Sequence, residues 1–325
     1  MTLNLTSGLS PDMISMLEFR LSLGFSVRSY MDHFKTLDRF CNEHHPAAME
    51  LNEDIVLGWL QTHPGEVNVL NQRASCIRML GKYIISTGKS AYILPKKFVS
   101  PQKSYVPYIL SDQELTDIFS SIDAYPANVR LDALQPALFS TLFRLIYTCG
   151  LRPSEGRALL CKHVNLSTGE ILITATKKHK DRMVVLSDDM NAMAKRYAEM
   201  RNTIHPDSPY FFPCKNGVPY TEKMLGWHFK NFIVAANPGV EKESLPKVRI
   251  YDLRHRFATT VMLKWIDERR DLYNMLPYLS TYMGHAKFTQ TAYYIQLIPE
   301  NLKNSQGIDW KAMGTLIPEV SPWEE

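Results

Sequence analysis

The sequence has no long apolar segment and few cysteines. No stretch approaches the ~18 apolar residues of a membrane span, and the first residues, MTLNLTSGLSPDM, have neither the basic nor the apolar part of a secretion signal. The cysteines are five in number and widely spaced, which argues against a disulfide framework and for a reducing compartment. We therefore expect a cytoplasmic protein that makes no membrane contact.

A strong excess of one charge is also lacking. The 37 Lys and Arg residues face 33 Asp and Glu residues, and the net charge of +4 permits binding to a polyanion without indicating it. With 325 residues, 45% of them hydrophobic, the chain is long enough for two separate hydrophobic cores. Two folded domains are the expected organisation.

Residues 1–94 are expected to form a small helical domain. Ser10 and Pro11 are typical of a helix start, a second helix is predicted from Ser26, and a third follows Asn52. A fourth has apolar residues at helical spacing and ends before Gly88. These helices must bury their apolar faces against one another.

Residues 95–110, with three prolines and three lysines between 95 and 109, are predicted to be a basic linker. A second domain is predicted over residues 111–300, starting at a capping box formed by Ser111 and Glu114. A helix around 138–147 ends at Gly150, and strands at 170–175 and 182–186 predict a hairpin with the basic tip TKKHKD. Further helices are expected at 188–203, 222–236, 252–265, 271–283 and 289–297. The fold class is therefore mainly α with a small β-sheet.

Residues 301–325 are too apolar for a free chain end. The apolar residues concerned are Ile308, Trp310, Met313, Leu316 and Ile317. We interpret this tail as a segment that packs against a neighbouring subunit.

Three separated segments carry residues suited to chemistry on phosphate: TCGLRPSE (148–155), YDLRHRFAT (251–259) and MGHAKFTQTAYY (283–294). Together with the basic hairpin tip, they resemble the signature of the tyrosine recombinase (phage integrase) family. That signature has an Arg after Gly-Leu, a hairpin Lys, His-x-x-Arg, Gly-His, and a Tyr about nine residues later. Each motif alone is weak, but their order and spacing are specific. The resemblance covers 111–300, while the N-terminal helices fit the family's core-binding domain by size and helix content.

The resemblance implies a role for each matching residue. Arg152 and Arg254 would bind the scissile phosphate, Lys177 would be the general acid, His285 would occupy the second histidine position, and Tyr294 would be the nucleophile. One position departs from the pattern, because Tyr251 stands where most members have His. A phenol gives up its proton far less readily near neutral pH than an imidazolium does, so Tyr251 is expected to hydrogen-bond the phosphate.

Alternatives remain for two of these roles, the general acid and the nucleophile. The hairpin lysines Lys177, Lys178 and Lys180 are hard to separate, and register favours Lys177 as the acid. Tyr293 adjoins Tyr294, and spacing from His285 favours Tyr294.

His255 is interpreted as a core histidine rather than a catalytic one. Lys178 and Lys180, with Lys96, Lys97 and Lys103 of the linker, are candidate contacts to DNA phosphates.

The residue types in these segments suit displacement at a phosphodiester, without reference to any family. Displacement at a phosphodiester builds negative charge, and two guanidinium groups can stabilise it in place of a metal. A tyrosine that attacks phosphorus stores the bond energy in a covalent link, so ATP is not needed. No cofactor is expected. His44 and His45 lack a second ligand pair for zinc, so no metal site is expected either.

The resemblance implies a site-specific DNA recombinase that forms a 3′-phosphotyrosyl intermediate on double-stranded recombination sites. It would act as a homotetramer on DNA, could be a monomer when free, and could work with accessory recombinases. Residues 265–284 resemble recombinases carried by bacterial transposons. Two alternatives stay open: a type IB topoisomerase, which relaxes supercoils, and an inactive DNA-binding accessory protein.

Overall fold

The computed structural model describes residues 4–62, 67–98, 106–126, 133–174, 181–285 and 287–297, apart from the side chain at position 296. The chain divides into two compact units between residues 105 and 106, within the predicted linker. Among the described residues, no helix combines the length and apolar character needed to cross a membrane. The division at the linker is consistent with two separate cores.

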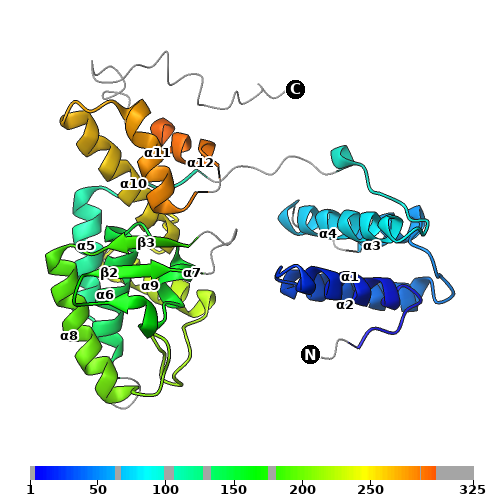
Figure 1. The fold of residues 1–325 in the computed structure, drawn as a ribbon, viewed down its shortest axis with the longest axis horizontal. Helices are drawn as coiled ribbons and strands as arrows, with labels where there is room; N and C mark the ends of the chain where they lie inside the picture. Colours follow the sequence, from blue (N-terminus) through cyan, green and yellow to red (C-terminus); the bar gives the residue numbers. More distant parts are fainter. Residues whose placement is uncertain are drawn as a thin grey trace. The chain divides into compact units, whose positions relative to one another are not determined.

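The described residues of the N-terminal unit form a bundle of four helices (Figure 1). They are α1 (Ser10–Ser22), α2 (Arg28–His44), α3 (Glu53–Gln61) and α4 (Val67–Ser86). Asn52 caps α3, since its side chain accepts a hydrogen bond from the backbone N–H of Ile55 at 2.9 Å. The apolar faces meet in one core, where Phe34, Leu37 and Trp59 are almost completely buried. After α4, the short 3-10 helix η1 (Lys96–Phe98) carries Lys96 and Lys97, both exposed.

In the described residues of the C-terminal unit, the larger hydrophobic core lies around α6. The helices of this unit are α5 (Asp112–Asp123), α6 (Gln135–Thr148), α7 (Pro153–Arg157), α8 (Asp188–Ile204), α9 (Glu222–Ala235), α10 (Ile250–Asp267), α11 (Leu272–Met283) and α12 (Thr289–Ala292), with 3-10 turns η2 (Cys161–His163) and η3 (Tyr293–Leu297). The capping box predicted for Ser111 and Glu114 is present at the start of α5. Since α6 contacts α5, α8 and α10, its apolar residues lie at the centre of the core.

A three-stranded antiparallel sheet completes this unit, in the order β1 (Val164–Asn165), β2 (Glu170–Ile173), β3 (Arg182–Val185). The register pairs Ile171 with Val184, and both side chains are buried while Leu172 between Ile171 and Ile173 is exposed. This alternation confirms the predicted hairpin. Its tip, with Lys177, Lys178 and Lys180, lies outside the described residues.

One predicted helix is divided. The segment expected as a single helix over 289–297 is an α-helix only to Ala292 and continues as the 3-10 turn η3. Short 3-10 turns are common at helix ends, where hydrogen bonds from residue i+3 tighten the last turn. Tyr294 therefore lies in a 3-10 turn rather than an α-helix.

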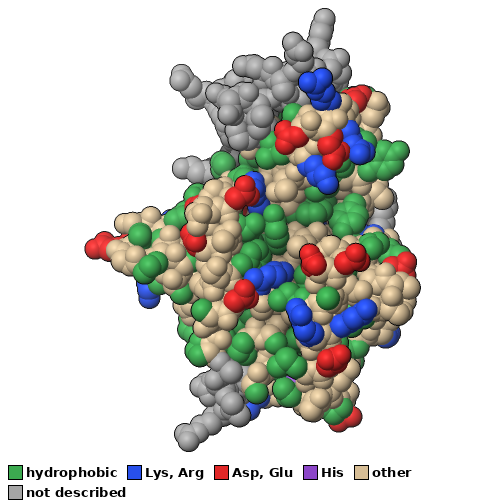
Figure 2. Space-filling model, turned by 90° about the vertical axis from the view of Figure 1, so that its left-hand side faces the viewer, with side chains coloured by type: hydrophobic (Ala, Val, Ile, Leu, Met, Phe, Trp, Pro, Cys, Tyr) green, Lys and Arg blue, Asp and Glu red, His purple; other side chains and the backbone are tan. Residues whose placement is uncertain are grey.

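Charge is mixed on the face shown in Figure 2, where Lys and Arg side chains are interspersed with Asp and Glu among apolar ones. The small positive excess of the chain is not gathered there into a basic patch. The C-terminal unit contains Arg152 at the N-cap of α7, Arg182 in β3 and Arg254 in α10.

Gly150 ends α6 in a left-handed conformation, with φ 57°. The backbone N–H of Leu151 closes the turn on Ile146 O at 3.0 Å. A Cβ at Gly150 would lie 2.4 Å from Cδ1 of Phe257, on α10. The close contact brings the end of α6 against α10.

Gly150→Ala is expected to lower the free energy of unfolding by at least about 2 kcal/mol, because a left-handed alanine costs about 1–2 kcal/mol and the ring must also move. The matched control is Gly239→Ala, since Gly239 has φ 85° but no atom within 4 Å of an added Cβ. Urea denaturation of both variants measures the difference. Equal losses of unfolding free energy in the two variants would show that the close contact with Phe257 adds nothing to the cost.

Candidate active site

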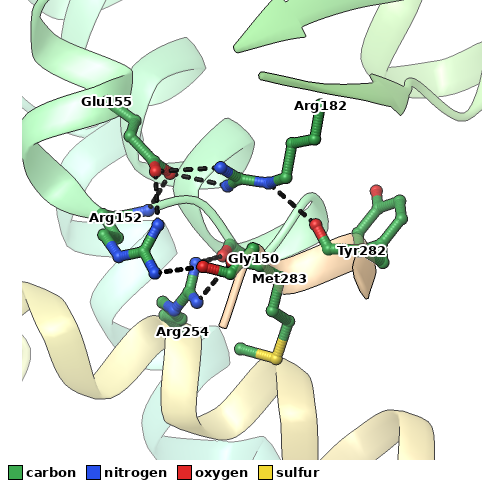
Figure 3. Close-up of polar contacts among 8 residues, drawn as sticks. Gly150, Arg152, Glu155, Arg182, Arg254, Tyr282 and Met283 are labelled. Atoms are coloured by element: carbon green, nitrogen blue, oxygen red, sulfur yellow. Dashed lines mark hydrogen bonds and ion pairs between the residues drawn. The ribbon is translucent and has the colours of Figure 1, made fainter. Parts of the chain in front are cut away.

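Three successive backbone carbonyls at the C-terminal end of α11, those of residues 282–284, each accept a hydrogen bond from a different arginine (Figure 3). Arg182 donates from Nε to the first at 2.8 Å, Arg254 to the second at 2.7 Å, and Arg152 to the third at 2.6 Å. The last carbonyls of a helix have no partner within it and lie at its negative end. The end of α11 therefore gathers three guanidinium groups from β3, α10 and the start of α7.

Glu155, on α7, is the carboxylate among these arginines. Its two oxygens accept hydrogen bonds from Arg182 at 2.9 and 2.7 Å and from Arg152 at 2.7 Å, and a further bond comes from the backbone N–H of Arg152 at 2.9 Å. Burial alone would raise the pKa of Glu155, but these hydrogen bonds and the charge of Arg182 lower it to about 2. Glu155 is thus ionised and fixes the position of both side chains.

Arg254 is completely buried in α10. Its terminal nitrogens donate to Gly150 O at 2.6 Å and Met283 O at 2.7 Å, and its Nε finds no acceptor among the described residues. A guanidinium has five N–H donors, so further donors remain for a ligand. A buried cation with spare donors is suited to binding an anion such as phosphate.

Tyr294 is 2% exposed in η3, and its hydroxyl lies 3.1 Å from Nδ1 of His255. The ring of His285 stacks on it, with centroids 6.0 Å apart and planes at 23°. Burial raises the pKa of Tyr294 to about 12, although the charge of Arg254 opposes the shift. The phenol is therefore protonated at neutral pH and needs a proton acceptor before it can act as a nucleophile.

His285 follows Gly284, and its Nδ1 lies 2.7 Å from the hydroxyl of Thr291. Burial, then the charges of Arg254, Arg152 and Arg182, lower the pKa of His285 to about 3. His285 is therefore neutral at pH 7, where it can hydrogen-bond a phosphate oxygen. A bound anion would offset the arginines and favour its protonation.

Tyr251 lies in the first turn of α10, with its ring centroid 5.0 Å from that of His255 and 6.0 Å from Cζ of Arg254. No group of three or more His, Cys, Asp or Glu residues suited to a metal ion occurs in the described ranges. Among the described residues, the site thus combines arginines and the carboxylate of Glu155 with two histidines and two phenols. This combination fits chemistry on a phosphate ester.

A model of the phage integrase family matches residues 109–300, more than half of the chain. The chain belongs to the phage integrase family. The prediction of a tyrosine-type site-specific DNA recombinase with a mainly helical fold and a small sheet is therefore confirmed.

Named relatives agree with this membership. The chain is 27% identical over 287 residues to y4rE of Sinorhizobium fredii, described as an integrase or recombinase, covering 86% of this chain and 88% of that protein. It is 25% identical over 237 residues to the tyrosine recombinase XerD of Caulobacter vibrioides, covering 71% of each.

Two solved structures share the fold. The XerH recombinase bound to its palindromic difH substrate matches with a TM-score of 0.62 and 20% identity, over 88% of this chain and 80% of that one. The Tn1549 transposon integrase with a circular intermediate DNA matches with a TM-score of 0.63 and 16% identity, over 90% and 95%.

Within this integrase fold, the structure brings together five of the predicted site residues: Arg152, Tyr251, Arg254, His285 and Tyr294. Lys177, Lys178, Lys180 and Lys103 lie outside the described residues. Lys96 and Lys97 belong to the N-terminal unit.

Arg182 and His255 make contacts that the sequence did not predict. His255 is four residues after Tyr251 in α10, so the two share one helix face, and this spacing is the signal that could have identified it. Arg182 stands at the start of β3, next to the basic tip, where it is easily taken for part of that charge run. Its side chain is instead buried against Glu155.

Two half-buried histidines of the site, His255 and His285, predict a loss of stability in mild acid. Burial, then the charges of Arg249 and Arg254, lower the pKa of His255 to about 4, and that of His285 is about 3. An unfolded chain takes up these protons near pH 6.5, so stability is complete above that pH and falls as the pH drops toward 4. Between pH 7.5 and 5.0 we expect a loss of up to about 2 kcal/mol for each histidine.

Urea denaturation of the full chain at the two pH values measures this loss. In His255→Asn, which removes one of the two sites, the loss is expected to be smaller by up to about 2 kcal/mol. A loss identical in the wild-type and variant chains would contradict this assignment.

Proposed function

We propose that this recombinase cleaves and rejoins duplex DNA by attack of the Tyr294 oxygen on a backbone phosphate. The Tyr294 oxygen forms a bond to phosphorus, the bond from phosphorus to the 5′-oxygen breaks, and the DNA 3′ end remains attached as a 3′-phosphotyrosyl link. Attack by a free 5′-hydroxyl reverses the reaction. The observation that carries the proposal is the convergence of Arg152, Arg254 and Tyr294 from three distant segments onto one site.

The two arginines supply the charge that this reaction needs. Negative charge grows on the non-bridging phosphate oxygens during displacement, and a fixed guanidinium stabilises it without reorganisation. Arg254 is held by two backbone carbonyls and Arg152 by Glu155 and Gly284 O, so both are ordered before DNA binds. Preorganised donors of this kind contribute about 10²–10³ in rate each.

The remaining residues are assigned to protons and to hydrogen bonding. Lys177 is proposed to protonate the leaving 5′-oxygen, with Lys178 and Lys180 contacting nearby phosphates. His285 is neutral in the free protein and is proposed to bind the phosphate, which would favour its protonation. Tyr251, beside Arg254 and His255, is proposed to hydrogen-bond the phosphate in place of the more usual histidine.

The DNA partner is proposed to be a double-stranded recombination site of a mobile element, bound by a homotetramer, with or without accessory recombinases. Support comes from the shared fold of the Tn1549 transposon integrase, which was solved with transposon DNA. The exposed residues Lys96 and Lys97, together with Lys103, are proposed to contact DNA phosphates. The relatives do not favour the topoisomerase or the inactive accessory protein.

Residues 301–325 are proposed to pack on a neighbouring subunit. An apolar groove of about 880 Å³ lies between β3, α10 and α11, lined by Phe257, Trp265 and Tyr278 among others. Tyr278 is 70% exposed. The apolar residues of the tail fit such a surface by chemistry.

Nicked duplexes tiled across the DNA that flanks the gene test the proposed function. A nick beside the scissile phosphate releases a short fragment, so the covalent complex accumulates and survives denaturation. A label at the 5′ end of the cleaved strand is expected to stay with the protein, whereas a 3′ label is expected to be lost. A retained 3′ label would contradict the 3′-phosphotyrosyl link.

Covalent complex formation is expected to continue at an undiminished rate in EDTA, because the two guanidinium groups carry the charge that a metal ion would otherwise neutralise. The control is the same reaction with added Mg²⁺. A strict requirement for Mg²⁺ in strand cutting would contradict this proposal.

A further inference from the structure

His255 lies within hydrogen-bond distance of the Tyr294 hydroxyl oxygen. Its Nδ1 is 3.1 Å from that oxygen. Its other ring nitrogen, Nε2, is 3.9 Å from Oδ1 of Asp252, which is completely buried one turn earlier in α10. The imidazole therefore lies between a phenol and a carboxylate.

We propose that His255 is a catalytic residue of this recombinase, the base that accepts the proton of Tyr294, and that Asp252 is the positioning residue that orients its ring. This proposal rests on the proposed function. In the neutral tautomer that carries its hydrogen on Nε2, facing Asp252, Nδ1 has a free lone pair and accepts the hydrogen bond from the phenol. An acid, a histidine and a nucleophile in series are the arrangement that activates weak hydroxyl nucleophiles elsewhere.

Asp252 is itself fixed. Its Oδ2 accepts the backbone N–H of Arg249 at 2.7 Å, and Oδ1 lies 3.7 Å from the guanidinium of Arg249. These contacts hold the carboxylate at the N-terminal end of α10, where a negative charge is favourable. The ring of His255 cannot turn freely, since Tyr251 packs beside it with centroids 5.0 Å apart.

One cycle of cleavage and rejoining transfers the Tyr294 proton to His255 and returns it. The phenol proton moves from the Tyr294 oxygen to Nδ1 of His255 as that oxygen bonds to phosphorus, and the 5′-oxygen leaves with a proton from the general acid. On rejoining, the 5′-hydroxyl returns its proton to the general acid as it attacks, the bond from phosphorus to Tyr294 breaks, and His255 returns the proton to the phenol. No oxidant, reductant or other reactant is consumed.

The charges around His255 come from three elements. On α10 and its N-cap are Asp252, Arg249, Arg254 and the phenol of Tyr251; η3 contributes Tyr294, and the loop after α11 contributes His285. Burial and the two arginines hold the pKa of His255 at about 4, so the ring is neutral and able to accept a proton at pH 7.

Transfer from a free phenol to such a base would be unfavourable. It becomes favourable during the reaction, since bonding to phosphorus makes the phenol oxygen strongly acidic. The proton is therefore expected to move together with the attack.

His255→Asn separates this role from packing. The asparagine Oδ1 can lie near the place of Nδ1 and accept the same hydrogen bond, but it cannot take up a proton at neutral pH. DNA affinity and melting temperature are expected to stay close to those of the wild type, while covalent complex formation at pH 7 falls about 10²–10⁴-fold. His205→Asn, at the C-terminal end of α8, is the matched control and should cleave like the wild type.

The pH profile gives a second readout. The wild-type rate should be nearly constant between pH 6.5 and 9, since the base is already neutral. In His255→Asn the phenol must lose its proton to water or hydroxide, so the cleavage rate should rise about tenfold per pH unit. The difference between the wild-type and variant rates should therefore narrow as the pH rises. Parallel pH profiles for the wild type and His255→Asn would overturn the role of His255 as the base.

A DNA substrate with sulfur in place of the leaving 5′-oxygen provides the decisive comparison, because a thiolate leaves without a proton. This substrate should restore cleavage by Lys177→Ala but not by His255→Asn. Restoration of His255→Asn, or cleavage of ordinary DNA by that variant within about threefold of wild type, would overturn the role. His255→Gln serves if the asparagine variant does not fold. If wild-type protein forms no covalent complex with any tiled duplex, the proposed function itself is overturned.

Discussion

Tyr294→Phe is expected to abolish the covalent complex with nicked DNA, lowering its rate of formation by at least about 10⁴-fold, because no other oxygen replaces the nucleophile. The variant keeps the ring that stacks on His285 and loses the hydroxyl, whose hydrogen bond to His255 contributes about 1 kcal/mol. It should therefore fold and bind DNA nearly as well as the wild type. Denaturing gels with 5′-labelled strands measure the first property, and mobility shifts measure the second.

Tyr293→Phe is the matched control, since Tyr293 adjoins Tyr294 in the chain while its ring lies at 56° to that of Tyr294, with centroids 6.4 Å apart. Tyr293 is also only half-buried, whereas Tyr294 is 2% exposed and contacts both histidines. The control should form the covalent complex at the wild-type rate. An inactive Tyr293→Phe beside an active Tyr294→Phe would reverse the assignment of the nucleophile.

Local signals in the sequence were sufficient to predict most elements of this fold. Ser111 with Glu114, and Asn52 before an apolar segment, mark helix starts through hydrogen bonds made within three residues. The hairpin followed from alternation between Ile171, Leu172 and Ile173. These features depend only on residues close together in the chain, so a single sequence is enough to identify them.

The hydrogen bonds that hold the arginines of the site in place could not be predicted in the same way. Arg152 donates to Gly284 O across 132 residues and Arg254 to Gly150 O across 104, and every residue type has a backbone carbonyl. The order and spacing of the motifs located the arginines, but not the end of α11 that gathers them. For His255, the position between Asp252 and Tyr294 is what distinguishes it from an ordinary core histidine, and that position is a property of the fold.

Arg254→Lys tests whether the geometry of the guanidinium, beyond its charge, is required. One ammonium can hardly replace a planar group that spans Gly150 O and Met283 O and still has donors left for a phosphate. Covalent complex formation is expected to fall about 10³-fold or more, because bidentate contact to the phosphate is lost during displacement. The free energy of unfolding should also fall by a few kcal/mol, since a buried carbonyl loses its donor.

The two effects can be separated by measuring cleavage at a temperature well below the melting transition of the variant, with DNA affinity determined in parallel. Arg144→Lys is the matched control, because Arg144 is an arginine of the same unit paired with Asp123 at 2.6 Å near the surface. That control should retain the wild-type rate, since partly exposed ion pairs contribute at most about 1 kcal/mol. If Arg254→Lys cleaves within about tenfold of the wild type while folded, charge alone suffices at this position, and the two carbonyls that hold Arg254 have a structural role only.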